Sequence, residues 1–350
     1  MSITAKELAK QLGLSEAAVS IALNNKPGVS TKTRKRVIEA AQANGYDFSR
    51  FQNAAEPVTD KGIIYFVVYR KNGTVVPDLS HDSGTYLDIP FFTQLSQGIS
   101  NACKQLHYQL NVSYFYEDDD PTASLAEWKR IGVKGLILLG TEMNEYDLKQ
   151  FTGSGLPIVL LDNYFEHINV DCVMINNVQG AYTATQYLIR KTHAQPGYLR
   201  SSYSITGFEE RGDGFYKAIR RNGLSTSQSP IHHLSPTVEG AYCDMKELLS
   251  QKEKPARCYF ADNDQIAIGA MRAFQEAGYR IPEDIAIIGF DDMPICSYVN
   301  PALTTVHVPK LYMGELAVQR LDNILHSPGN PPVKIEVATS ITKRGTIPHQ

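Results

Sequence analysis

Residues 3–46 contain three short apolar runs, each with the spacing of one face of a helix. A residue able to cap a helix N-terminus precedes each run: Thr4, Ser15, and either Ser30 or Thr31. Gly13 separates the first two runs, and glycine readily takes the left-handed conformation that ends a helix. Together with Ala9 and Val19, it has the spacing of a helix-turn-helix, whose second helix enters the DNA major groove.

This segment is also the basic part of the chain. Residues 1–53 hold eight of the chain's 34 Lys and Arg and four of its 37 acidic residues, a net charge of +4. The remaining residues therefore carry a net charge of −7. A small three-helix module can also dock a protein. A basic N-terminal segment on an otherwise acidic chain, however, favours a nucleic-acid-binding domain.

The segment contains, in this order, Ala9 to Ser15, Val19-Ser20, Leu23-Asn24, Val29 to Arg34 and Gly45-Tyr46. In order and spacing, these residues resemble the headpiece of the LacI/GalR family of transcriptional regulators. It implies a DNA-binding headpiece over residues 1–46. The polar residues 47–61 follow as a hinge, either extended or with one short helix at Ser49 to Ala55.

Composition bounds the class and the compartment. The chain has 350 residues, enough for two or three domains, and is 43% hydrophobic and 20% charged, as is usual for globular proteins. It has no apolar signal segment and no run of the ~18 to 20 apolar residues that a membrane span needs, so we expect a cytoplasmic protein. Its five cysteines are scattered, which argues against disulfides and a zinc site. We expect no metal and no cofactor.

From Gly62 onward, apolar strands alternate with amphipathic helices, a pattern typical of α/β folds with parallel sheets. We expect two doubly wound parallel-sheet lobes, the first over about 62–162 plus 292–325. The second then takes about 163–291 plus 326–350. Because open parallel sheets bind ligands beyond the carboxyl ends of their strands, two facing lobes form a cleft between them.

This body resembles the sugar-binding core of the same family, which periplasmic binding proteins share. The resemblance is carried by Glu210 to Phe215, Ala261 to Ala270, Ile281 to Asp292, Pro301 to Val306 and Lys343 to Thr346. Together with the headpiece, it covers essentially the whole chain. It implies a core that binds an effector and forms a homodimer.

The helical spacing and the resemblance select the residues expected to contact operator DNA. Those in the second helix face the groove, and short polar or basic side chains near the helix ends suit phosphate oxygens. The expected set is Thr4, Ser15, Glu16, Ala17, Ser20, Ile21, Asn24, Ser30, Thr33, Arg34 and, in the hinge, Ala55.

Two base-reading positions depart from the family. Where many members carry an arginine that can bind guanine, this chain has Ile21, which offers only an apolar contact such as one to a thymine methyl. Glu16 can accept a hydrogen bond from cytosine, or it can simply stabilise the positive end of its helix. We therefore expect an operator sequence that differs from those of typical members.

Polar residues after the predicted strands are candidates for effector binding. Asp162, Asn263 and Asp291 each follow an apolar strand, and we place Arg211 at the start of a helix over residues 211–222. The family has ligand-binding residues at these positions, and it often places an aromatic side chain where Phe91 and Phe92 stand. The expected ligand-binding set is Phe91, Phe92, Asp162, Arg211, Asn263 and Asp291.

Each of these side chains also has a structural alternative. Arg211 and Asp291 could form an ion pair between the lobes, and Asn263 and Asp162 could cap the turns that follow them. One phenylalanine could face the ligand while the other faces the core. Trp128, in the middle of a predicted helix, is expected in the core.

Three classes of function fit a two-lobed α/β core. We favour a transcriptional regulator, a repressor of carbohydrate-use genes whose homodimer binds double-stranded operator DNA and a sugar or sugar phosphate. A solute-binding protein of a sugar transporter is the alternative, although the basic headpiece argues against it. An enzyme ranks third, because the chain has no P-loop, G-x-S-x-G or H-E-x-x-H motif.

The hinge provides a first prediction. Where the family usually wedges a leucine into the central minor groove of the operator, this chain has Ala55, whose methyl group is a poor wedge. We expect the protein to bend its operator less than typical members do. A phased-bend assay measures this angle, and a strong central kink would contradict the expectation.

Overall fold

The computed structural model describes residues 3–23, 28–44, 46, 60–71, 90–251 and 254–348. The chain forms two compact units, Met1–Asp60 and Lys61–Gln350, and each is described by itself. Asn24, the hinge residues Ser49 to Ala55 and most of the loop before Pro90 lie outside the described residues.

The first unit contains α1 (Ala5–Leu12), α2 (Glu16–Leu23) and α3 (Thr31–Ala43). Thr4 and Glu7 form a reciprocal capping box at the start of α1, and Gly13 ends this helix with a φ of 65°. The buried side chains of the three helices form one small core: Leu8, Ala9, Val19, Ala22, Leu23, Val37 and Ala41. The helix-turn-helix predicted from these apolar runs is therefore present.

The second unit contains two sheets. In spatial order, the first sheet consists of β11 (Lys334–Val337), β5 (Asp171–Ile175), β4 (Ile158–Leu161), β3 (Gly135–Leu139), β1 (Ile63–Arg70) and β2 (Gln109–Tyr116). All of its strand pairs are parallel. We call this sheet and the helices packed on it the first lobe.

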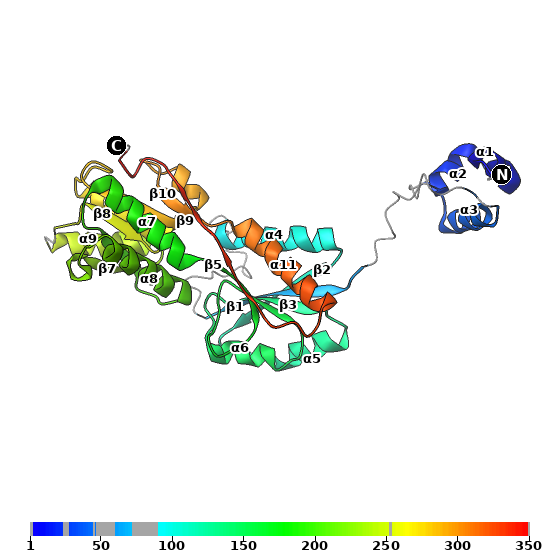
Figure 1. Ribbon diagram of the computed structural model, residues 1–350, viewed down its shortest axis with the longest axis horizontal. Helices are drawn as coiled ribbons and strands as arrows, with labels where there is room; N and C mark the ends of the chain where they lie inside the picture. Colours follow the sequence, from blue (N-terminus) through cyan, green and yellow to red (C-terminus); the bar gives the residue numbers. More distant parts are fainter. Residues whose placement is uncertain are drawn as a thin grey trace. The chain divides into compact units, whose positions relative to one another are not determined.

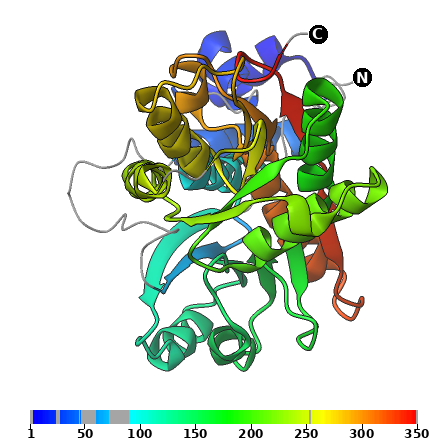
Figure 2. The ribbon, with the colours of Figure 1, turned by 90° about the vertical axis from the view of Figure 1, so that its left-hand side faces the viewer.

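Helices cover both faces of the first sheet. Phe66 and Val68 of β1 face the cluster that includes α4 (Pro90–Leu106) and α11 (Lys310–His326). The alternate residues Val67 and Tyr69 face the cluster that includes α5 (Thr122–Arg130) and α6 (Glu145–Thr152). Figures 1 and 2 show α5 and α6 on the face opposite α11. Trp128 is buried there as predicted, with its ring 4.2 Å from that of Tyr65.

The second sheet has the same strand arrangement. In spatial order it consists of β12 (Ser340–Thr342), β10 (Thr304–His307), β9 (Ala286–Asp291), β8 (Cys258–Ala261), β6 (Gly197–Ser201) and β7 (Ile231–Leu234). Only β12 is antiparallel to its neighbour among these pairs. The expected fold class, two parallel-sheet α/β lobes with a helical headpiece, is confirmed.

The helices of this second lobe pack in two pairs. Helix α7 (Asn177–Thr192) lies against α8 (Thr206–Arg221), and α9 (Val238–Ser250) lies against α10 (Asp264–Glu276). The short 3-10 helices η2 (Thr226–Gln228) and η3 (Pro294–Ser297) complete the elements. None of the described helices is long and apolar enough to cross a membrane.

The strand pairing corrects the expected lobe boundaries. We expected the first lobe to end near residue 162, but β5 pairs with β4 and extends the first sheet to Ile175. Strand β10 was expected in the first lobe and pairs with β9 in the second. The segment 326–350, expected in the second lobe, is divided between the two sheets, because β11 joins the first sheet and β12 the second. An apolar run in a sequence does not say which neighbour it will pair with, and this is why the boundaries differ.

Helix α11 provides a test of the packing. Leu321 is fully buried, and its side chain lies so close to Gly135 of β3 that a Cβ there would clash. Replacing Leu321 with Ala should lower the unfolding free energy of the core by about 2–5 kcal/mol, because it leaves a cavity. Urea denaturation followed by the fluorescence of Trp128 measures this loss.

Leu311 on the same helix provides the matched control. Its side chain is exposed, so Leu311→Ala should change the unfolding free energy by less than about 0.5 kcal/mol. Equal losses for the two variants would contradict the placement of α11.

Candidate DNA-reading surface and effector site

One side of α2 carries the expected base-reading residues. Glu16, Ala17 and Ser20 are exposed and Ile21 is half-buried, while Val19 on the other side is in the core. These positions recur at the spacing of a single helix face. The described part of the headpiece thus leaves this face of α2 accessible.

The expected phosphate-contacting hydroxyls cap the three helices. Thr4 Oγ1 accepts a hydrogen bond from the Glu7 amide, and Ser15 Oγ accepts one from the Ala18 amide. Ser30 Oγ accepts one from the Thr33 amide at 3.0 Å, and the two hydroxyls are 2.7 Å apart. These groups lie at helix N-termini, where backbone amides favour anions such as phosphate. Asn24 and Ala55, also expected to contact DNA, lie outside the described residues.

The two arginines of α3 reach the carboxyl ends of the other two helices. Arg34 Nη1 donates to the carbonyls of Ile21 and Ala22 at 3.5 and 3.4 Å. Arg36 Nη2 donates to the Leu12 carbonyl at 3.0 Å.

In the second unit, two expected site residues occupy equivalent places in the two sheets. Strands β4 and β9 have the same position in the strand order, and Asp162 follows β4 as Asp291 ends β9. Their φ angles are 65° and 110°, a region that residues other than glycine rarely adopt. Such backbone strain concentrates at functional sites.

Arg211 is buried at the centre of this polar cluster. Its Nε donates to Asn177 Oδ1 at 2.9 Å, and its Nη1 donates to the Asp262 carbonyl. Its Nη2 lies 3.2 Å from Asp291 Oδ1, and the guanidinium stacks on the Phe290 ring, 3.8 Å from its centre. Both partners of the ion pair belong to the second lobe, so the alternative of a pair between lobes is wrong.

The position of Arg211 in its helix also differs from the expectation. Helix α8 begins at Thr206, so Arg211 lies inside the helix and not at its start. Phe208 is buried and lies on the same face of the helix as Phe215, about two turns later. This early apolar residue extends the helix toward its N-terminus.

Burial and neighbouring charges set the protonation of the cluster. Burial raises the pKa of Asp162 to about 6, although a hydrogen bond from Thr141 at 2.7 Å and the charge of Arg211 oppose the rise. Burial also raises the pKa of Asp291, against the effect of Arg211 and Lys310. Arg211 therefore interacts electrostatically with an aspartate from each lobe.

Asn263 caps a helix, and the two phenylalanines pack in the core. Asn263 caps α10, with its Oδ1 accepting from the Ile266 amide at 2.8 Å, while its amide nitrogen takes no part in this cap. Phe91 and Phe92 are both buried and contact each other edge to face at 5.1 Å. The expected division, with one ring toward the ligand and one toward the core, is not seen in their burial.

Three further polar residues were not expected in this cluster. Lys310, the first residue of α11, is buried and donates to the carbonyls of Asp291 and Val308, and burial lowers its pKa. A lysine in the first turn is unfavourable for the helix dipole, and this feature of the sequence could have indicated a special role for Lys310. Burial also raises the pKa of both Asp262 and Asp264 to about 7.

These two aspartates hold the strand ends together. Asp262 accepts from the Ser201 amide at 2.6 Å and from the Tyr198 hydroxyl. Asp264 accepts from the Met293 amide at 2.8 Å and from the Thr305 hydroxyl. Their positions beside Asn263 in the sequence gave no indication of these partners.

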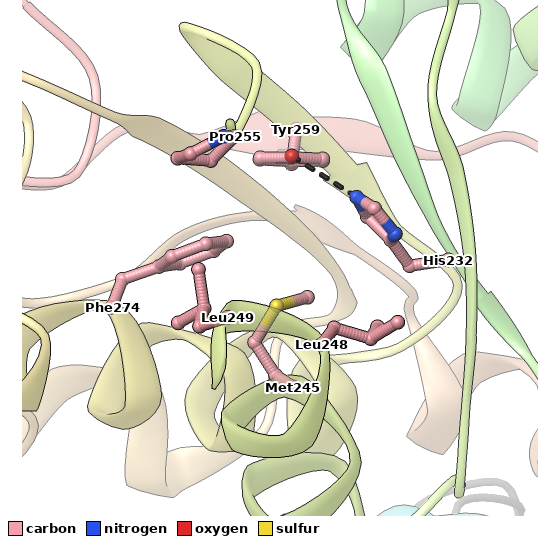
Figure 3. A pocket seen from close by; sticks show the side chains of 7 residues that line it. All are labelled: His232, Met245, Leu248, Leu249, Pro255, Tyr259 and Phe274. Atoms are coloured by element: carbon pink, nitrogen blue, oxygen red, sulfur yellow. Dashed lines mark hydrogen bonds between the residues drawn. The ribbon is translucent and has the colours of Figure 1, made fainter. Parts of the chain in front are cut away.

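A separate pocket in the second lobe is too small to hold an effector. It lies between α9, α10 and the strands β7 and β8, and His232 approaches the Tyr259 hydroxyl at 3.2 Å inside it (Figure 3). Its lining is mainly apolar: His232, Met245, Leu248, Leu249, Pro255, Tyr259 and Phe274. Its volume of about 10 Å³ fits no more than about one water molecule.

Comparisons with known proteins match both units. A family model described as bacterial regulatory proteins, lacI family, matches residues 4–48, and one described as a periplasmic binding protein-like domain matches residues 185–347. The regulator GalS of Salmonella typhimurium is 31% identical over 319 residues, which cover 91% of this chain and 88% of GalS. The repressor PurR of Aliivibrio salmonicida is 30% identical over 323 residues, covering 91% of each chain.

Solved structures have the same fold. A LacI family transcriptional regulator from Enterococcus faecium with bound ribose has a TM-score of 0.66 and 25% identity, covering 81% of this chain and 98% of that one. The lac repressor dimer bound to operator and an anti-inducer has a TM-score of 0.68 and 22% identity, covering 99% of each chain.

Asp162 provides a pH-dependent prediction. Because its pKa is raised in the folded state to about 6, the folded chain binds this proton more tightly than the unfolded chain. Its contribution to stability is therefore lost as the pH rises from about 4 to about 6. Asp162→Asn removes the titration and can still accept the bond from Thr141, so the unfolding free energy of the variant relative to wild type should increase over this interval.

Urea denaturation at about pH 4 and pH 7 measures this difference. Asp213→Asn, an exposed change on α8, is the control and should show no such trend. A stability difference for Asp162→Asn that does not vary with pH would contradict the assignment.

Proposed function

Because the chain belongs to the lacI family of bacterial regulatory proteins, as its resemblance predicted, we propose that it represses carbohydrate-use genes under the control of a sugar-like effector. It is a transcriptional regulator with a DNA-binding headpiece and an effector-binding core, not an enzyme. The match of residues 4–48 to the family disfavours a transporter's solute-binding protein. In this proposal the protein acts in the cytoplasm, where its DNA target lies.

The headpiece binds operator DNA through α2. In this proposal Glu16, Ala17 and Ile21 contact base edges, and Ser20 contacts phosphate beside them. The cap hydroxyls bind phosphate oxygens at the helix N-termini: Thr4, Ser15, Ser30 and Thr33. A homodimer presents two headpieces to the two halves of a pseudo-palindromic operator, as the two-fold symmetry of a dimer requires.

The observation that carries the effector proposal is the geometry of Asp291. Its Oδ1 is buried beside the Arg211 guanidinium, yet no donor among the described residues makes a hydrogen bond to it. A buried carboxylate oxygen with unused acceptor capacity points to a ligand that supplies the donor. A sugar hydroxyl fits, since it can donate to Asp291 and accept from Arg211 at the same time.

Residues of both lobes complete this binding site. Asp162 of the first lobe accepts a second hydroxyl, the Asn263 amide nitrogen donates to a third, and Phe91 and Phe92 supply apolar surface. The E. faecium regulator, which has been solved with bound ribose, supports this class of ligand. By contacting both lobes, the effector changes their relative orientation and thereby the DNA affinity, with a coupling of about 1–3 kcal/mol.

A ligand screen tests the effector proposal. Thermal unfolding of the full chain is followed with cellobiose, ribose, other mono- and disaccharides, their phosphates and purine bases. We expect a sugar to raise the Tm, because ligand binding stabilises the folded state by mass action. Asp291→Ala should abolish the shift, since it removes both the acceptor and the anionic partner of Arg211.

Asp213→Asn serves as the control on the same lobe, and it should respond to the ligand as wild type does. A shift produced only by purine bases would overturn the sugar assignment. A shift that survives in Asp291→Ala would overturn the site.

A further inference from the structure

The two helices of the helix-turn-helix are short. Helix α2 has eight residues, and no basic side chain lies in its own last turn. The last four carbonyls of any helix lack intrahelical partners, and together they carry a partial negative charge of about half an electron. A helix of this length is marginal without tertiary support. A cation beside these carbonyls would therefore stabilise the carboxyl end of α2.

Arg34 of α3 supplies this cation. Its side chain is half-buried, and Nη1 lies between the carbonyls of Ile21 and Ala22, at 3.5 and 3.4 Å. The first of these carbonyls belongs to a base-reading residue. Arg36, two residues later, makes the corresponding bond to Leu12 at the end of α1, so α3 contacts the ends of both helices.

The lysines of α3 differ in their surroundings. Lys32 and Lys35 are exposed, and the one ion pair that involves Lys35, with Glu39, is long at 3.9 Å and solvent-exposed on both sides. Exposed pairs of this kind contribute little energy. These ammonium groups therefore remain available to phosphates.

We propose that Arg34 is a positioning residue of the DNA-reading surface, which holds the carboxyl end of α2 and so orients Ile21 toward the bases. The basic patch of α3 is thus divided by role: the lysines attract phosphate, and Arg34 acts through α2. This rests on the headpiece binding DNA, and it replaces the expectation that Arg34 contacts phosphate.

Salt dependence separates these roles. Each phosphate neutralised by a side chain contributes about 0.9 to the slope of log K against log salt concentration. On a duplex of random sequence, Lys32→Met should lower the slope by about this amount for each bound headpiece, and Arg34→Met by less than half of it. The full-length chain is used throughout.

Sequence discrimination should respond in the opposite way. The ratio of the Kd for a random duplex to the Kd for a duplex selected by the wild-type chain should fall about tenfold in Arg34→Met, because α2 is no longer fixed. In Lys32→Met the ratio should stay near that of wild type, since a phosphate contact weakens binding to all sequences alike.

Hydrogen exchange without DNA tests the contact directly. Amides of α2 should exchange about five- to tenfold faster in Arg34→Met and at the wild-type rate in Lys32→Met. Arg34→Lys keeps the charge on a shorter side chain, so it serves if Arg34→Met fails to fold. It should retain the wild-type slope and still lose discrimination.

Two results would overturn the proposal. One is a full loss of about 0.9 in slope per bound headpiece for Arg34→Met with unchanged α2 exchange. The other is wild-type discrimination and exchange in Arg34→Lys. If the wild-type chain shows no salt-dependent DNA binding, DNA binding itself fails, whereas the exchange of α2 still decides the role of Arg34.

Discussion

The polar end of the second lobe depends on the buried guanidinium of Arg211. The side chains of Asp262 and Asp291 lie beside it and are largely buried, and a carboxylate in such a place is costly unless a cation or hydrogen-bond donors face it. Arg211 meets this need by pairing with Asp291 while it bonds to Asn177 and stacks on Phe290. Breaking such a pair on one side leaves an uncompensated buried charge, at about 3–5 kcal/mol. The same residue thus supports the fold and faces the proposed ligand.

The two lobes carry an aspartate with the same unusual backbone conformation at equivalent strand ends. In the first lobe, β4 lies beside β3, the strand that precedes α6, and is followed by Asp162. In the second lobe, β9 lies beside β8, the strand that precedes α10, and ends at Asp291. Both aspartates have a positive φ. Asp162 is stabilised by Thr141 from the neighbouring strand end, and Asp291 by the cations around it. The positive φ ends the extended backbone at this point, so each aspartate lies at the carboxyl end of its strand.

Local patterns predicted much of this architecture. The caps at Thr4 and Ser30, the core position of Trp128 and the strand-end aspartates all follow from residue type and spacing over a few residues. These features depend on interactions between near neighbours in the chain. The resemblance to a known family added the order of the two units, which spacing alone does not give.

Features that depend on distant partners could not be predicted in this way. The burial of Lys310 requires a strand end from the other lobe, and the pairing of Arg34 requires the end of another helix. Whether β5, β10 and β11 join one sheet or the other is likewise decided by tertiary packing. A lysine or arginine in an amphipathic helix looks the same in sequence whether it meets solvent or a carbonyl.

The exchange of segments between the sheets has a consequence for synthesis on the ribosome. The headpiece is continuous and contains its own core within residues 3–46, so it can fold as soon as it emerges. The first lobe instead needs α11 and β11, which are made almost last. Until then the face of its sheet that meets Met313 and Leu321 is uncovered, and exposed apolar surface of this kind favours aggregation. A chain that stops before residue 337 would thus have a folded headpiece attached to a first lobe that cannot complete its fold.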